Sequence, residues 1–168
     1  HIVDGGAAGD QLIELLAAAP QRGREATGVI KWNADHTYET LQQGTNQLVC
    51  YDRSSERGRR PFAVQCTNLA NLDRVAQNRR FRAATTDRDS ETAMIRAAEA
   101  NGTRAEVAYG SMFIAMSGPD MASAGTHTTI AVPGATAAST GFPTSREGGG
   151  AYLMEAGTGG AHIMVPGR

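Results

Sequence analysis

Apolar residues at helical spacing mark three segments of the chain. In residues 10–19, leucine and alanine at positions 12, 15, 16 and 19 would share one helix face, with Asp10 as N-cap and Pro20 as the stop. Residues 68–82 and 87–100 show the same periodicity. We therefore predict two or three helices of ordinary length.

Most of the remaining apolar residues lie in short runs that are separated by turn residues. Such runs, often β-branched or alternating with polar residues, are typical of strands. They cover residues 27–32, 36–42, 48–51, 62–66, 111–116, 126–132, 151–156 and 161–165. Residues 134–150 look too irregular for a helix or a strand. The sequence thus predicts an α+β fold, a mainly antiparallel β-sheet packed by two or three helices in a single domain over residues 1–168.

The last third of the chain contains one phrase twice, a histidine followed by a short apolar run and Val-Pro-Gly. The copies begin at His127 and His162. Proline cannot donate to a sheet and glycine permits a turn, so both runs are predicted to be strands of the core sheet on which the other elements pack. A tight Gly-Thr-Gly-Gly loop would place Glu155 opposite His162, with Tyr152 and Met154 on the core face. A slip of one residue would invert these faces.

The charge of the chain argues against a nucleic-acid or membrane partner. Net charge is −1 over 168 residues, and no run of eighteen apolar residues occurs. Residues 52–82 hold eight arginines, which would suit phosphate or a base face. A solvated loop and helix face is the favoured interpretation, because the rest of the chain is acidic. Nucleic-acid binding is therefore not expected.

The two cysteines, Cys50 and Cys66, lie in separate predicted strands. If these strands are antiparallel neighbours, the cysteines would form a disulfide that contributes roughly 3 kcal/mol. A disulfide favours a secreted or periplasmic protein, and the alternative is two half-buried thiols in a cytosolic one. No C-x-x-C occurs, so a zinc knuckle or a thioredoxin-type site is not expected.

Two stretches resemble a group of uncharacterised bacterial exported proteins. One is Gln43-Gly44-Thr45-Asn46 leading to Cys50, similar to a "GTNG-W-C" stretch in that group. The other is Ala156-Gly157-Thr158 leading to residues 161–166, similar to "AGT-P-AHxMxP". Here Gln47 follows Asn46 where the group has glycine, and Gly159-Gly160 stands where it tends to have proline and an aromatic residue. The resemblance implies export and supplies no activity.

Glu155 and His162, with His127 nearby, are the candidate chemical residues. A carboxylate beside an imidazole raises its basicity, as a general base requires, and two histidines can share a metal. The alternative is a solvated cross-strand ion pair. An N-terminal His1 would chelate copper only with a second histidine such as His36, His127 or His162, and a tag remnant is the simpler explanation.

No motif assigns an activity. The chain has no P-loop, Rossmann fingerprint, EF-hand loop or H-E-x-x-H, and no cofactor is expected. The favoured function is an exported binding or structural protein without catalysis, able to form a homo-oligomer through a sheet edge. The alternative is a small metal-binding protein or a hydrolase-type enzyme that uses His127, Glu155 and His162.

Overall fold

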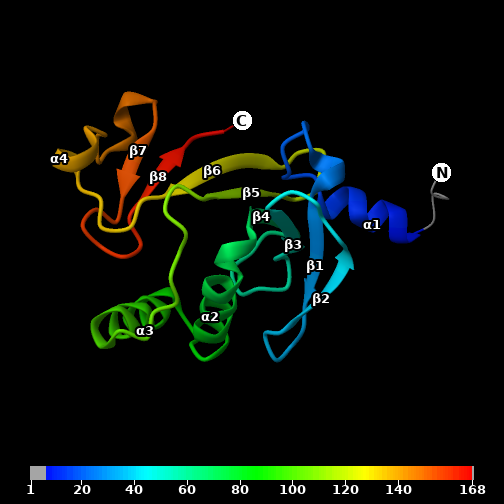
Figure 1. Ribbon diagram of the computed structural model, residues 1–168, viewed down its shortest axis with the longest axis horizontal. Helices are drawn as coiled ribbons and strands as arrows, with labels where there is room; N and C mark the ends of the chain where they lie inside the picture. Colours follow the sequence, from blue (N-terminus) through cyan, green and yellow to red (C-terminus); the bar gives the residue numbers. More distant parts are fainter. Residues whose placement is uncertain (1–6, 168) are drawn as a thin grey trace.

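Residues 7–167 are described by a computed structural model (Figure 1). The strands are β1 Gly28–Trp32, β2 Tyr38–Gln42, β3 Leu48–Asp52, β4 Phe62–Asn68, β5 Met112–Gly118, β6 Gly125–Ala131, β7 Tyr152–Met154 and β8 His162–Val165. They form one eight-stranded sheet in the order β2-β1-β3-β4-β5-β6-β8-β7. All neighbours pair antiparallel except β1 and β3. The predicted α+β class is confirmed.

The helices are α1 Ala7–Leu15, α2 Leu72–Ala83, α3 Arg88–Asn101 and α4 Ala137–Thr140, with short 3-10 turns η1 Arg24–Ala26, η2 Leu69–Asn71 and η3 Arg146–Gly148. The segment of α4 was predicted to be irregular, but Thr136 and Ser139 form a capping box that begins a helical turn. Within residues 7–167, no helix combines the length and the apolar composition needed to cross a bilayer.

The two faces of the sheet are covered by different helices. Strand residues alternate between faces, so Cys50 packs toward α1 while its neighbours Val49 and Tyr51 pack toward α2. Helices α2 and α3 contact each other and lie together on one side of the sheet (Figure 1). This second side is where the candidate site is found.

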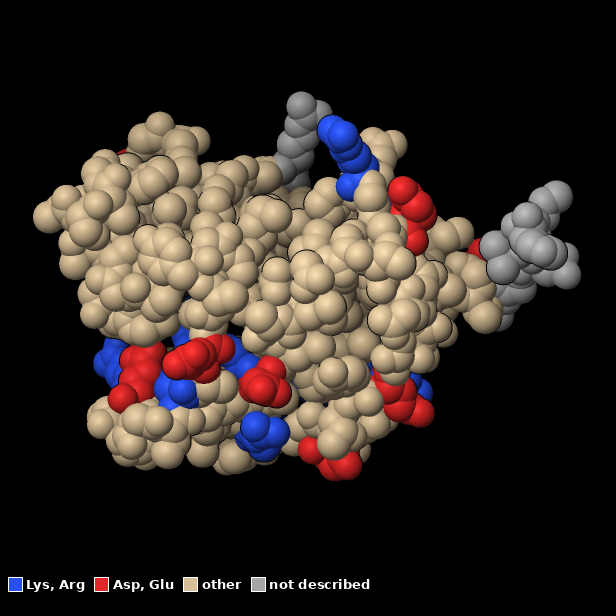
Figure 2. Space-filling model, in the orientation of Figure 1, with Lys and Arg blue, Asp and Glu red and all other residues tan. Residues whose placement is uncertain are grey.

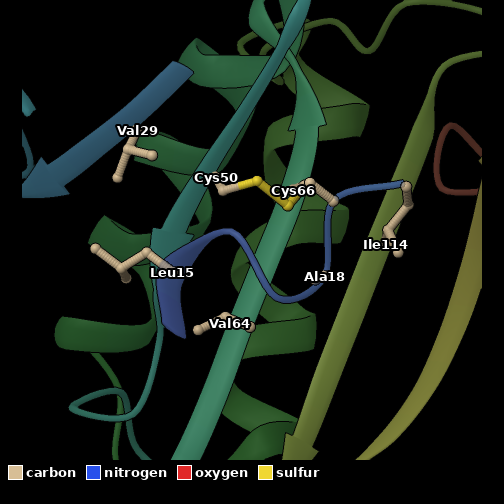
Figure 3. Close-up of a cluster of buried hydrophobic side chains, with 8 residues drawn as sticks. Leu15, Ala18, Val29, Cys50, Val64, Cys66 and Ile114 are labelled. Carbon is tan, nitrogen blue, oxygen red and sulfur yellow. A yellow bond between two sulfur atoms is a disulfide. The ribbon is translucent and has the colours of Figure 1, made fainter. Parts of the chain in front are cut away.

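The predicted disulfide is present. Cys50 of β3 lies directly opposite Cys66 of β4, and their sulfurs are bonded at 2.01 Å. Figure 3 shows the bridge among buried side chains that include Leu15 at the end of α1, Val29 of β1 and Ile114 of β5. Both cysteines are fully buried. The disulfide therefore joins the two strands inside the core rather than at the surface.

Helix α1 differs from the prediction at both ends. Asp10 lies inside the helix rather than at its N-cap, and the helix ends at Leu15, not at Pro20. The chain continues in turns, and the guanidinium of Arg24 donates to the carbonyl of Ala19 from Nε at 3.1 Å and Nη2 at 2.6 Å. This side chain satisfies a backbone group that a longer helix would have left exposed at its end.

The stretch that carries the first resemblance has a structural role. A Cβ on Gly44 would lie 2.4 Å from the main-chain nitrogen of Gly28, so only glycine fits there. The amide of Asn46 donates to the carbonyl of Gly23 at 3.1 Å and to Oγ1 of Thr27 at 3.0 Å. Residues before β3 are thereby locked against the start of β1.

The register predicted for the last hairpin is wrong by one residue. Met154, not Glu155, lies opposite His162, and Leu153 lies opposite Ile163. Leu153 is 1% exposed and belongs to the core, so the faces of β7 are inverted. Glu155 has a φ of 52°, which ends the strand early and lengthens the loop.

The last third of the chain forms one end of the sheet, not its centre. The prediction that the other elements pack on these strands is therefore also wrong. The middle strands are β4 and β5, while β7 is an edge strand. The two copies of the repeated phrase, which begin at His127 and His162, do form neighbouring strands, β6 and β8. Their core lies on the same face as α1, which leaves the other face open toward α2 and α3.

Candidate functional site

The turn between β7 and β8 brings Glu155 and His162 close together. Glu155 Oε2 lies 3.7 Å from His162 Nδ1, but the Glu155 side chain is 59% exposed. The same Nδ1 lies 2.8 Å from the carbonyl oxygen of Gly160. A carbonyl can only accept, so Nδ1 carries the proton and donates to it, and in the neutral ring Nε2 is left as an acceptor. The pair is a product of the turn rather than of cross-strand pairing.

His127 does not join this pair. Ala131 of β6 lies opposite His162, and His127 is four residues further along the same strand on the same face. At about 3.3 Å per residue the two positions are about 13 Å apart along the sheet, so His127 pairs with neither side chain, although the charge of His162 is among the causes that lower the pKa of His127. Within residues 7–167, no three histidine, cysteine, aspartate or glutamate side chains are placed to hold a metal ion. A metal or hydrolase role stays a prediction that rests on Glu155 and His162.

The remaining histidines lie elsewhere. His36 is in the turn between β1 and β2 with a φ of 67°, and His1 lies outside the described residues. Burial lowers the pKa of His127 from 6.5, and the positive charges of Arg59 and Arg53 lower it further. His127 is thus near the arginines of the β3–β4 loop rather than near a carboxylate.

A cavity of about 340 Å³ lies between the sheet and helices α2 and α3. We call it the interlayer cavity. Phe113, Thr129 and Ala131 of β5 and β6 form its floor together with His162. Its walls come from α2, α3, the connection after α3 and the β7–β8 turn. Figure 2 shows acidic and basic side chains gathered along the boundary between the sheet layer and α3.

Arg74 of α2 is the most buried charged residue that lines the cavity. It is 8% exposed. Its guanidinium donates to the carbonyls of Ala105 at 2.8 Å and Gly159 at 3.1 Å. Within residues 7–167, no carboxylate oxygen lies within 4.0 Å of a nitrogen of the Arg74 side chain, so Arg74 forms no ion pair there. Burial lowers its pKa, yet an arginine remains charged.

Arg104, next to the Ala105 carbonyl that Arg74 contacts, is likewise held by neutral acceptors. It donates to Gln77 Oε1 and Asn78 Oδ1, both at 2.7 Å, and stacks on Phe81 with 5.8 Å to the ring centroid. All of these partners are neutral. Burial lowers its pKa to about 10, and the charge of Arg74 contributes in the same direction. Two positive charges therefore face the cavity without a carboxylate bound to either.

Two carboxylates stand beside the same cavity, next to the glycines of the β7–β8 turn. A Cβ on Gly159 would lie 2.9 Å from Glu99 Oε1, and one on Gly160 would lie 2.8 Å from Glu155 Oε2. Among the described residues, Glu99 forms no ion pair, and the only ion-pair partner of Glu155 is His162. The two glycines therefore let these carboxylates approach the turn.

A cluster that we call the arginine hub adjoins the cavity and shares Arg82 with it. Its centre is Glu56 of the β3–β4 loop, whose side chain is 6% exposed. Glu56 pairs with Arg53 and Arg79, each at 2.9 Å, with Arg82, and with Arg59 at 3.7 Å. Burial lowers the pKa of Arg59 to about 10, and Arg53 and Arg82 contribute as like charges.

Arginines dominate the whole cleft, meaning the interlayer cavity and two adjoining hollows that share Arg82 with it. Four glutamates line it against nine arginines, a net formal charge of +5 in a chain whose total is −1. The nine are Arg53, Arg57, Arg59, Arg74, Arg79, Arg82, Arg88, Arg96 and Arg104. The sequence favoured solvated arginines over residues 52–82. This interpretation holds for Arg57 and Arg59, which are exposed, and is wrong for the arginines that are buried or half-buried in the cleft, namely Arg53, Arg74, Arg79 and Arg82.

No known protein family, curated protein or solved structure matches this chain. The functional argument therefore rests on the geometry of the cleft.

Proposed function

We propose that this is an exported binding protein that holds a small organic anion in the interlayer cavity without catalysing a reaction. The observation that carries the proposal is Arg74, a residue that is 8% exposed and whose guanidinium donates to neutral carbonyls. Glu99 and Glu155 act on this charge from a distance without pairing with it, and a buried charge without a paired counter-charge costs several kcal/mol. An anionic ligand placed against Arg74 and Arg104 would offset that cost and would give the ligand charge-assisted hydrogen bonds.

The size and lining of the cavity favour an organic ligand over a bare inorganic anion. Its volume of about 340 Å³ lies at the small end of the range for ligand pockets, about 300–1,000 Å³. Phe113, Ile95 and Val107 line it with apolar surface. A carboxylate with a small apolar body matches both kinds of surface. No serine or cysteine nucleophile is among the described residues that line it, which favours binding.

The test is a ligand series on the purified chain, using inorganic phosphate, hexanoate and 3-phenylpropionate in isothermal calorimetry and thermal unfolding. We expect 3-phenylpropionate to bind and to raise the melting temperature with concentration, as a ligand of the folded state must. Arg104→Gln should weaken binding at least about tenfold, which is about 1.4 kcal/mol. Arg80→Gln, an exposed arginine of α2, is the matched control. Absence of binding by every organic anion, or equal loss in the control, would refute the proposal.

Export is supported by the disulfide, because such bonds persist in oxidising compartments. The check is acid trapping of free thiols in cells that make the full-length protein, followed by mass spectrometry. We expect Cys50 and Cys66 to be recovered as a disulfide in the extracytoplasmic fraction. Recovery of both as free thiols in the cytosol would contradict export.

Self-association is a second candidate function, and the edge strand β2 favours it. Among the described strands β2 is the last of the sheet on its side, and four of its five residues are exposed. Tyr38 and Leu41 present apolar surface there, at 46% and 42% exposure. An exposed edge with apolar residues can pair with a second strand. Sedimentation velocity should show a dimer that Leu41→Lys dissociates, and a wild-type chain that stays monomeric would rule it out.

A further inference from the structure

We propose that the ligand of the interlayer cavity is a zwitterion of the α-amino-acid type. Its carboxylate would lie against Arg74 and Arg104, and its ammonium group against Glu99 and Glu155. This inference rests on the proposed binding function and names the class of ligand. It predicts a preference that a site for simple anions would not show.

The first argument is that opposite charges face this cavity without pairing. The other internal pair in its lining is complete, since Arg82 Nη2 and Glu91 Oε1 lie 2.9 Å apart. Arg74 and Glu99 both approach Gly159, one by a hydrogen bond to its carbonyl and the other beside its Cα, yet they form no ion pair with each other. Positive and negative groups are therefore held a few ångströms apart across one residue.

The second argument concerns the geometry of the acidic side. Gly159 and Gly160 are consecutive, so their Cα atoms are about 3.8 Å apart. Glu99 and Glu155 reach these two positions from α3 and from the end of β7. Two carboxylates are thereby held at one short turn, and this turn also carries the carbonyl that binds Arg74.

The third argument is electrostatic selection. Burial lowers the pKa of Arg74 and of Arg104, and the charges of Glu99 and Glu155 oppose that effect at both residues. The two glutamates thus act on both arginines across the cavity. A ligand with only a carboxylate would bring a third negative charge beside the two glutamates, which is the repulsive element that specificity requires. A zwitterion complements both sides and leaves its side chain for Phe113.

The experiment compares three probes with one carbon skeleton, phenylalanine, 3-phenylpropionate and 2-phenylethylamine, by isothermal calorimetry. They differ only in which charged groups they carry. We expect phenylalanine to bind at least about tenfold more tightly than either of the others. In the double variant Glu99→Gln with Glu155→Gln, that preference should disappear while 3-phenylpropionate binds as well as before or better. Glu106→Gln, an exposed glutamate near Arg104, is the control.

Each outcome decides between the two proposals. If 3-phenylpropionate binds as tightly as phenylalanine, the zwitterion is overturned and the anion site stands. If the double variant folds with a normal circular dichroism spectrum and keeps the preference for phenylalanine, the assignment of Glu99 and Glu155 is overturned. If all three probes bind more weakly than about 1 mM, both proposals fail.

Discussion

Neutralising Glu56 should destabilise the protein more than the loss of one hydrogen bond would explain. The carboxylate is 6% exposed and pairs with Arg53, Arg79, Arg82 and Arg59. Glu56→Gln keeps the shape of the side chain but leaves these guanidiniums close together without their shared counter-charge. Among the described residues, Arg82 alone of the four has a second carboxylate partner, Glu91 at 2.9 Å. The change therefore converts an attractive hub into a repulsive one.

The expected magnitude follows from the burial of the hub. Removing one partner of a buried ion pair costs about 3–5 kcal/mol, because a charge is left buried and unpaired. For a chain of this size, each kcal/mol lowers the melting temperature by about 2–4 °C, so we expect a fall of roughly 6–20 °C. Urea unfolding at pH 7 and differential scanning calorimetry give the two values. Glu106→Gln, which removes an exposed glutamate, should change stability by less than about 0.5 kcal/mol.

Two further measurements separate charge from packing in the hub. Adding Arg59→Gln to Glu56→Gln should restore part of the lost stability, because Arg59 is the most exposed of the four arginines, at 37%. Packing loss alone would make the double variant less stable than the single one. A loss below about 1 kcal/mol in Glu56→Gln would refute the hub as a source of stability.

The acid limb of the stability curve gives an independent check on Glu56. Burial raises its pKa, but the hydrogen bond from Arg53 and the charges of Arg53, Arg82 and Arg59 outweigh burial and hold the pKa below 4.5. A carboxyl group whose pKa is lower in the folded than in the unfolded state stabilises the fold fully at a pH above its unfolded-state pKa. That stabilisation is lost as the pH falls through its folded-state pKa. The difference between wild type and Glu56→Gln should therefore be constant near neutral pH and shrink below pH 4.5.

Three other predictions concern the core, the loop before β3 and His127. Replacing Cys50 and Cys66 together by alanine should lower the free energy of unfolding in urea by about 3 kcal/mol, because the bridge closes a loop with a sequence separation of 16. Dithiothreitol should not lower the stability of this variant further. Equal stability of the variant and the wild type would contradict the prediction. Gly44→Ala places a Cβ 2.4 Å from a main-chain nitrogen and should cost about 1–3 kcal/mol in urea unfolding, whereas Gly148→Ala, with no atom within 4 Å, should be neutral. Burial and nearby positive charges lower the pKa of His127 from 6.5, so the folded state resists its protonation. His127→Gln should therefore lose less stability than wild type in urea unfolding as pH falls below 6.5. Parallel curves of unfolding free energy against pH for the two proteins would contradict this.

The arrangement of the cleft explains why two clusters with similar composition behave differently. In the arginine hub the positive charges share Glu56, which the protein itself supplies. In the interlayer cavity Arg74 and Arg104 are held by backbone carbonyls and amide oxygens. A guanidinium held by neutral acceptors keeps its charge available for a ligand, because no carboxylate neutralises it. The charges of the hub are therefore satisfied within the fold, whereas those of the cavity are the basis of the proposed ligand site.

Local pattern was enough for most of the secondary structure. Periodicity over residues 87–100 predicts α3 within one residue at each end, because a helix with one buried face must repeat its apolar positions every three or four residues. The disulfide also followed from the sequence, since the strands that carry Cys50 and Cys66 are joined by one loop and pair as antiparallel neighbours. Both features depend on residues that are near one another in the chain.

The last hairpin shows where local pattern stops being sufficient. Residues 151–156 alternate in a way that fits two registers, and the choice depended on which face had a core to enter. Leu153 packs with Val132 and Ile163, so the register that buries it was selected. The positive φ of Glu155 then ended the strand, a backbone conformation that no periodicity reports.

Local pattern alone predicted the fold class and most of the strands and helices, because burial of one face imposes a repeat along the chain, and it made the Cys50–Cys66 disulfide the favoured of two alternatives. Only the tertiary structure decided which charges meet. Arg74, Glu99, Arg104 and Glu155 come from α2, α3, the connection after α3 and the end of β7. Whether an arginine is solvated, paired or left facing a cavity depends on what distant segments place beside it. The net charge and the spacing along the chain contain no record of those neighbours.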